Sequence, residues 1–178
     1  MGNCSKIYKI LLTFFVLGFV VWLGGTIIRT TVAFDLFTPE THIELKPEYT
    51  NIERMNTIYI FSITAPIVGI AYVVATISAI LFGVLMRKEF KKKGWLFMIF
   101  CLFMITVPIQ IKFMYYDYII ANAVYFDKIN DFYNPIIQEY FVEQFKDVVN
   151  NSLRGILLLS ALTCVIYLIW RPLDSNSN

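Results

Sequence analysis

The sequence predicts an all-α membrane protein, a bundle of four transmembrane helices. Of its 178 residues, 58% are hydrophobic and only 16% are charged, whereas soluble domains carry about 25% charged residues. A chain this short and apolar has too little polar surface to cover a soluble core. Its apolar residues gather in four runs, each close to the length of about 20 residues that crosses a bilayer. We place the spans at about residues 10–29, 57–86, 95–120 and 153–170.

The first span is an uncharged run at residues 10–28, bounded by Lys9 and Arg29. It is long for the apolar region of a signal peptide, so we expect a retained helix. Three small residues on it allow another helix to approach closely. We expect these residues to pack within the bundle rather than to form a dimer contact: Gly18, Gly24 and Gly25.

The second span contains no charge from residue 58 to residue 86, which is longer than the bilayer requires. Thr50 and Glu53 have the spacing of a capping box, in which each residue's side chain accepts from the backbone N–H of the other. The helix is therefore expected to begin near Thr50. Pro66 is expected to kink it, because proline removes a backbone donor.

The third and fourth helices are predicted to extend beyond the membrane on its outer side. A helix over residues 94–126 would be about 50 Å long, against a hydrocarbon thickness of about 30 Å. Asn134 and Pro135 have the residue types of an N-cap and a first helical position. Residues 134–152 are expected to form one helix, continuous with the fourth span. Its apolar face would hold Ile137, Phe141, Phe145, Val148 and Val149.

Charge predicts the orientation, because positive residues stay on the cytoplasmic side during insertion. The turn at 87–93 carries five cationic residues, Arg87, Lys88, Lys91, Lys92 and Lys93. The first loop is instead acidic, with Asp35, Glu40, Glu44, Glu48 and Glu53. Both termini are thus expected in the cytoplasm, in a multi-pass protein of a plasma or inner membrane. Residues 1–173 would be a single domain and 174–178 a polar tail.

Four polar residues are predicted near the outer ends of the spans, namely Arg29, Gln110, Lys112 and Asp117. Charges at membrane depth are costly unless they are paired. We expect Arg29 to be neutralised by Asp117, and Lys112 to extend its ammonium group to the interface. In the alternative interpretation, the same residues line a path for a solute, with Pro66 and Pro108 breaking their helices.

Sequence motifs for catalysis or for a cofactor are not found. His42 is the single histidine and cannot supply a pair of haem ligands. The acidic loop lacks the spacing of a calcium motif and is expected to be a solvated surface. The motifs of hydrolases, zinc proteases and phosphate loops are missing as well. We therefore predict no catalytic residue, no cofactor and no metal site.

Two positions carry possible modification signals. Cys4 lies beside the first span and near Lys6, where palmitoylation is an option, although Lys6 breaks the myristoylation pattern. Asn150-Asn-Ser152 is formally a glycosylation sequon on the outer side. The net charge of +2 gives no reason to expect a nucleic acid partner.

Three functions fit these observations, in descending order. The first is a non-catalytic membrane subunit or scaffold, whose partners are the lipid bilayer and other membrane protein subunits. The second is an oligomeric channel or transporter component for an ion, lipid or small solute. The third is a membrane-embedded enzyme acting on lipid-like substrates, with Asp117 or the outer glutamates as acid–base residues.

Overall fold

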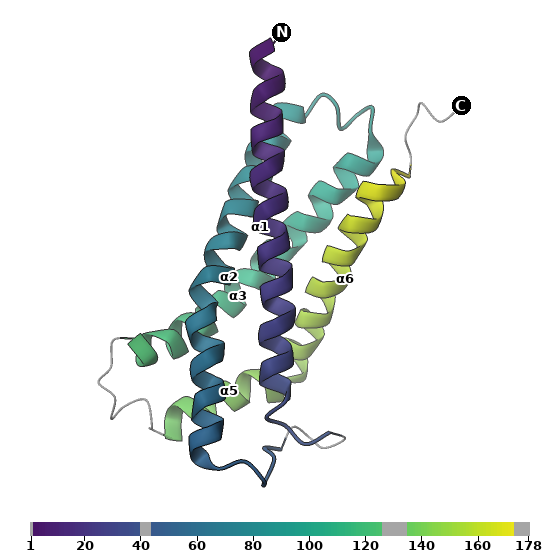
Figure 1. Cartoon of the computed structure of the whole chain (residues 1–178). Coiled ribbons are helices and arrows are strands. Elements are labelled where there is room, and N and C mark those ends of the chain that lie inside the picture. Colours follow the sequence, from purple (N-terminus) through teal and green to yellow (C-terminus); the bar gives the residue numbers. More distant parts are fainter. Residues whose placement is uncertain (1, 40–43, 126–134, 173–178) are drawn as a thin grey trace. The chain divides into compact units, whose positions relative to one another are not determined.

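The computed structural model describes residues 2–39, 44–125 and 135–172. Its helices are α1 (Gly2–Phe34), α2 (Asn51–Met86), α3 (Gly94–Tyr125), α5 (Pro135–Lys146) and α6 (Val148–Trp170), as Figure 1 shows. Four of them, α1, α2, α3 and α6, are long and apolar enough to cross a membrane. The prediction of an all-helical protein with four spans is confirmed, and it fits an integral multi-pass membrane protein.

The helix starts follow the capping signals of the sequence. The Thr50 hydroxyl accepts from the Glu53 N–H at 3.3 Å, and the Glu53 carboxylate accepts from the Thr50 N–H at 2.8 Å. This capping box places the start of α2 at Asn51, as predicted. Pro135 is the first residue of α5, also as predicted, while Asn134 lies outside the described residues.

Both internal prolines lie within uninterrupted helices. α2 continues through Pro66 and α3 through Pro108. The broken helices of the solute-path interpretation are therefore not found, and the kink at Pro66 stays a prediction. Hydroxyl groups near both prolines bond to backbone carbonyls, since Ser62 donates to the Ile58 carbonyl and Thr106 to the Phe103 carbonyl.

The chain folds into two compact units. Unit 1 comprises Met1–Leu23, Ile70–Gln110 and Gly155–Asn178, and unit 2 comprises Gly24–Gly69 and Ile111–Arg154. In unit 1, aromatic rings form the interior. The Trp22 and Tyr72 centroids lie 4.9 Å apart, and those of Tyr72 and Phe103 lie 5.7 Å apart. The Tyr72 hydroxyl is bonded to the Thr106 hydroxyl at 2.8 Å, which satisfies it in an apolar setting.

A close approach between α1 and α2 explains one of the glycines in unit 1. A Cβ atom added at Gly18 would lie 2.6 Å from the Ala71 carbonyl oxygen and 3.0 Å from the Ala75 nitrogen. Both neighbours are backbone atoms and cannot rotate away. The predicted use of this glycine for packing within the chain is confirmed. Gly24, on the same helix, has no neighbouring atom within 4 Å of an added Cβ.

This contrast gives a matched pair of substitutions. Gly18→Ala should lower the free energy of unfolding by about 1–3 kcal/mol, the usual effect of overpacking. Gly24→Ala should be neutral or stabilising by up to about 1 kcal/mol, because alanine favours the helix and nothing obstructs it. Reversible unfolding of each variant in detergent measures both effects. Equal losses at the two positions would contradict the close approach at Gly18.

The turn between α2 and α3 belongs to unit 1 and is held by an aromatic anchor. The Phe90 ring lies 5.9 Å from that of Phe97 and 5.4 Å from that of Phe100. Four of the five cationic residues of this turn are exposed, and Lys93 is half-buried beside Glu89, at 4.0 Å. The turn therefore presents concentrated positive charge on a short, ordered connection.

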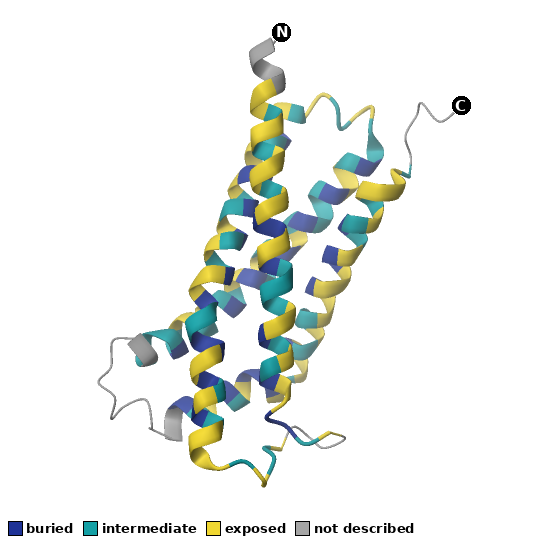
Figure 2. Ribbon diagram, in the orientation of Figure 1, coloured by how far each residue is buried: buried dark blue, intermediate teal, exposed yellow. Residues whose placement is uncertain are grey.

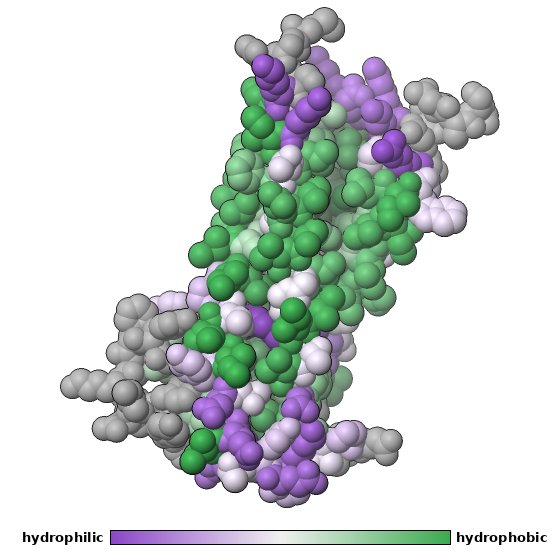
Figure 3. Space-filling model, in the orientation of Figure 1, coloured by the Kyte–Doolittle hydropathy of each residue, from purple (hydrophilic) through white to green (hydrophobic). Residues whose placement is uncertain are grey.

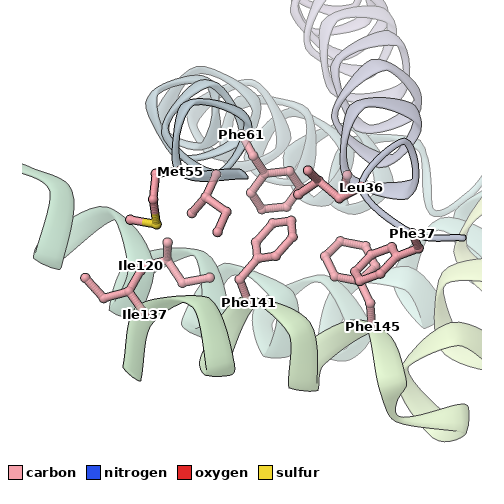
Figure 4. Packing of buried hydrophobic residues seen from close by; sticks show 10 residues of the cluster. Leu36, Phe37, Met55, Phe61, Ile120, Ile137, Phe141 and Phe145 are labelled. Carbon is pink, nitrogen blue, oxygen red and sulfur yellow. The ribbon is translucent and has the colours of Figure 1, made fainter. Parts of the chain in front are cut away.

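The interior of unit 2 is a cluster of large side chains between α5, α2 and the first loop. Phe141 and Phe145 of α5 are almost fully buried, and Phe61 of α2 meets them at 5.2 and 6.0 Å between ring centroids. Leu36 and Phe37, just after α1, complete the cluster (Figure 4). A bridge between Phe37 and Leu45 closes this loop on itself. The loop is thus part of the core of unit 2.

The predicted continuous helix over residues 134–152 is wrong. α5 ends at Lys146, and α6 begins at Val148. Asp147 separates them, because its carboxylate accepts from the Val149 N–H at 2.9 Å and caps α6. The change of direction also leaves Val148 and Val149 exposed by 77% and 59%, so neither joins the apolar face as predicted. Phe141 and Phe145 do lie on that face.

Large apolar side chains are exposed along the spans. Figure 2 shows exposed residues along much of α1, and the exposed side chains of this helix include Leu17, Val20 and Ile28. Figure 3 shows hydrophobic surface over the middle of α1 and of α6. In water such surfaces would favour aggregation, whereas in a bilayer they contact hydrocarbon.

Candidate functional site

The polar centre of unit 2 is a buried ion pair between α1 and α3. The Arg29 guanidinium donates to both carboxylate oxygens of Asp117, at 2.8 and 2.6 Å. The two side chains are only 9% and 14% exposed. This is the parallel, two-bond geometry that makes arginine–carboxylate pairs strong and specific. The pairing predicted from the sequence is confirmed.

Arg29 also engages α2, so the pair connects three helices. Its Nε donates to the Phe61 carbonyl at 3.1 Å, and its guanidinium carbon lies 4.0 Å from the centre of the Phe61 ring. Thr64 donates to the same carbonyl at 3.0 Å. These contacts compensate the loss of hydration that a buried guanidinium suffers. The arrangement fixes the Asp117 carboxylate, with one guanidinium N–H bonded to each of its oxygens.

A second arginine of unit 2, Arg154 of α6, was not among the site residues predicted from the sequence. Its side chain packs against aromatic rings. Its guanidinium carbon lies 3.8 Å from the centre of the Phe145 ring and 4.9 Å from that of Phe113. Since Phe145 also contacts Phe61, the two arginines flank one pair of rings. We call Arg29, Asp117, Arg154, Phe61 and Phe145 the arginine cluster.

Arg154 lies at the carboxyl end of α5. Its guanidinium donates to the Gln144 carbonyl at 3.4 Å, to the Gln144 side-chain oxygen at 3.3 Å and to the Asn151 side-chain oxygen at 3.3 Å. Asn151 itself donates to the Phe145 carbonyl at 2.6 Å. These bonds satisfy carbonyls that the end of a helix leaves open. The break at Asp147 thus brings Arg154 back against α5.

Two buried amide atoms beside this break have no hydrogen-bond partner among the described residues. They are Nε2 of Gln144 and Oδ1 of Asn150, and both residues are almost fully buried. The burial of Asn150 bears on the sequon at Asn150-Asn-Ser152. Its side-chain amide is not accessible in the folded unit, so the sequon does not present a glycosylation site there.

The other two predicted polar residues stand apart from the pair. Lys112, in unit 2, is half-buried and has no hydrogen bond or ion pair with a described residue. Gln110 is buried and belongs to unit 1. Of the four residues grouped from the sequence, the structure joins Arg29 and Asp117.

Residues of the acidic loop form hydrogen bonds with one another. The Tyr49 hydroxyl donates to the Asp35 carboxylate at 2.8 Å, and Lys46 donates to it at 3.1 Å. The Tyr49 bond, followed by Lys46, lowers the pKa of Asp35, and the bond to Asp35 raises the pKa of Lys46. No three metal-ligating side chains gather anywhere in the described ranges. Glu40 and His42 lie outside those ranges, as does the side chain of Cys4.

Comparison with protein-family models, with curated proteins and with solved structures found no match to this chain. Unit 2 holds the Arg29–Asp117 pair, the Lys46–Asp35 pair of the first loop, and Arg154, whose hydrogen bonds end on neutral oxygens. The cluster ties α1, α2 and α3 together and places a second positive charge at the α5–α6 break.

Proposed function

We propose that this chain is a non-catalytic integral membrane subunit or scaffold of a larger membrane protein assembly. The closed geometry of the Arg29–Asp117 pair supports this function. Both carboxylate oxygens face a group that stays protonated in proteins, so the pair is suited to hold helices and poorly suited to move protons. The large apolar side chains exposed along α1 and α6 offer surface to lipid and to neighbouring membrane helices.

In the proposed orientation both termini lie in the cytoplasm, together with the basic turn 87–93. The carboxyl end of α3, the loop after α1 and α5 would then lie on the outer side and stand above the hydrocarbon. Support comes from the exposed cations of the turn and from the length of α3, 32 residues or about 48 Å at the standard rise. A plasma or inner membrane fits this asymmetry of charge.

Cysteine labelling tests this orientation. Lys91→Cys should react with a membrane-impermeant maleimide only after the membrane is permeabilised. Glu44→Cys should react in intact cells. Both positions are exposed, so accessibility within the fold does not limit the reaction. The three native cysteines, Cys4, Cys101 and Cys164, are replaced by serine in the background used. The reverse labelling pattern would overturn the orientation.

The subunit function predicts a stable partner in the native membrane. Extraction of the tagged chain in a mild detergent, followed by native mass spectrometry, should give a complex with a second membrane protein at fixed stoichiometry. The partner should remain bound at high salt, because the exposed surfaces are apolar. A lone monomer in mild detergent and in nanodiscs would contradict the proposal. A homo-oligomer that passes ions or solutes in liposomes would replace it with the channel or transporter component.

A further inference from the structure

Arg154 is a partly buried cation of unit 2 that forms no ion pair with a described residue. Asp117, the carboxylate of the arginine cluster, already has both oxygens bonded to Arg29. Across the described part of the chain, no carboxylate lies within ion-pair distance of Arg154. The carboxyl end of α5 offers at most about half an elementary charge, and its effect is short-ranged. The positive charge of the Arg154 guanidinium is therefore only partly compensated within unit 2.

The bonds that Arg154 does make are long and end on neutral oxygens. Its three contacts measure 3.3–3.4 Å, whereas charge-assisted bonds of this type are about 2.7–2.9 Å. Gln144, which accepts two of them, also has a buried amide nitrogen without any acceptor. Asn150 Oδ1, beside the α5–α6 break, is a buried acceptor without a donor among the described residues. The guanidinium thus makes long bonds to neutral oxygens only, and an anion would give it shorter, charge-assisted bonds.

The flanking rings determine how such an anion can approach. Phe145 and Phe113 take up space around the guanidinium, with ring centres at 3.8 and 4.9 Å from its central carbon. Arginine presents its N–H groups in the plane of the guanidinium, and this fork matches the spacing of two phosphate oxygens. Arg154 is half-buried, so an anion can approach it without unfolding α6.

The position of Arg154 along α6 indicates where the anion comes from. The uncharged run after it, residues 155–170, is about 24 Å long at the standard helical rise, against about 30 Å of hydrocarbon. Arg154 therefore lies at the edge of the hydrocarbon, next to the lipid headgroups. Val148 and Val149, two turns or less before it, are exposed and apolar, as expected for a surface that meets lipid.

We propose that Arg154 binds the phosphate group of a membrane lipid at the amino-terminal end of α6. Arg154 supplies the charge and the donors, and Gln144 is a positioning residue that holds the guanidinium through its side-chain oxygen. The lipid phosphate supplies, from outside the chain, the negative charge that Arg154 lacks. This inference does not depend on the proposed subunit function.

The test compares lipids that differ in phosphate but share acyl chains. The full chain, purified in a maltoside detergent, is titrated with phosphatidylglycerol, with phosphatidylcholine and with phosphate-free glucosyl diacylglycerol. Native mass spectrometry measures how many lipids stay bound, and thermal unfolding measures Tm. One phospholipid of either kind should be retained and should raise Tm, and the glycolipid should do neither. Inorganic phosphate alone should not reproduce the increase, and if it does, a lipid is not the ligand.

Three variants locate the site. Arg154→Gln should weaken phospholipid retention about tenfold to a hundredfold, the range for bonds to a charged group. Arg171→Gln is the matched control, an exposed arginine at the other end of α6 that also lies over an aromatic ring, and it should retain the lipid. Gln144→Glu should place a carboxylate beside Arg154, raise Tm in lipid-free detergent and weaken lipid retention.

The third variant keeps the test informative if Arg154→Gln does not fold, because it adds a counter-charge instead of removing the arginine. Equal retention by Arg154→Gln and Arg171→Gln would overturn the proposal. Equal retention of the glycolipid and the phospholipids would overturn it as well, and so would unchanged lipid affinity in Gln144→Glu.

Discussion

Replacing Arg29 by methionine should lower the free energy of unfolding by about 3–5 kcal/mol, the usual effect of breaking a buried pair from one side. The loss arises because Asp117, at 14% exposure, is left without the two donors of Arg29. Asp117→Asn should be damaging for the corresponding reason, since it leaves Arg29 with a neutral partner. Unfolding of each variant in detergent, monitored by tryptophan fluorescence, gives the two free energies of unfolding.

The double variant separates a true pair from two independent charges. Arg29→Met with Asp117→Asn should cost clearly less than the sum of the single losses, because neither charge is then left alone. Lys112→Met is the matched control, a cation on α3 without a described partner, and it should change stability by no more than about 0.5 kcal/mol. If the two single losses simply add, the Arg29–Asp117 contact contributes nothing to the free energy of unfolding. Unchanged stability together with loss of ion or solute transport would favour the interpretation in which these residues line a solute path.

Phe145→Ala should cost about 3–5 kcal/mol, the range for truncating a buried phenylalanine. Phe145 is 1% exposed, and its ring contacts Phe61, Phe141 and the Arg154 guanidinium. Its loss opens a cavity and also exposes one side of that guanidinium. Limited proteolysis should then cut the α5–α6 region faster, since α5 is held in unit 2 through this face.

Two neighbouring positions serve as controls for this experiment. Glu143 and Val149 are both exposed, and neither side chain belongs to the cluster in Figure 4. Glu143→Ala and Val149→Ala should therefore each change stability by no more than about 0.5 kcal/mol. A loss at Val149 as large as that at Phe145 would mean that α6 presents a different face from the one described.

Hydropathy and helix-capping signals predicted much of this architecture, because both act through local sequence. The four spans follow from uncharged runs, the start of α2 from Thr50 and Glu53, and the start of α5 from Pro135. The Arg29–Asp117 pair was predictable for a different reason. Both residues lie near the same ends of their spans, and an unpaired charge at that depth is expensive enough to select a partner.

Features that depend on tertiary contacts were not predictable in the same way. An arginine at the edge of a span normally extends toward water, and nothing local places Arg154 between rings from α3 and α5. The break before α6 did have a local signal, since aspartate is a preferred N-cap. However, the apolar residues keep a helical period through Asp147, and this period predicted one continuous helix. For the same reason the exposure of Val149 was not predicted. The packing of Leu36 and Phe37 into unit 2 likewise follows from partners distant in sequence.

The Arg29–Asp117 pair has a consequence for biosynthesis. The two residues are 88 positions apart, and at about 5–20 residues per second the ribosome needs roughly 4–18 s to travel between them. α1 therefore enters the bilayer carrying an uncompensated arginine, and its insertion must be supported by the apolar run before it. Neutralisation comes only when α3 arrives. The first helix is thus made early, whereas the partner of its arginine is made late.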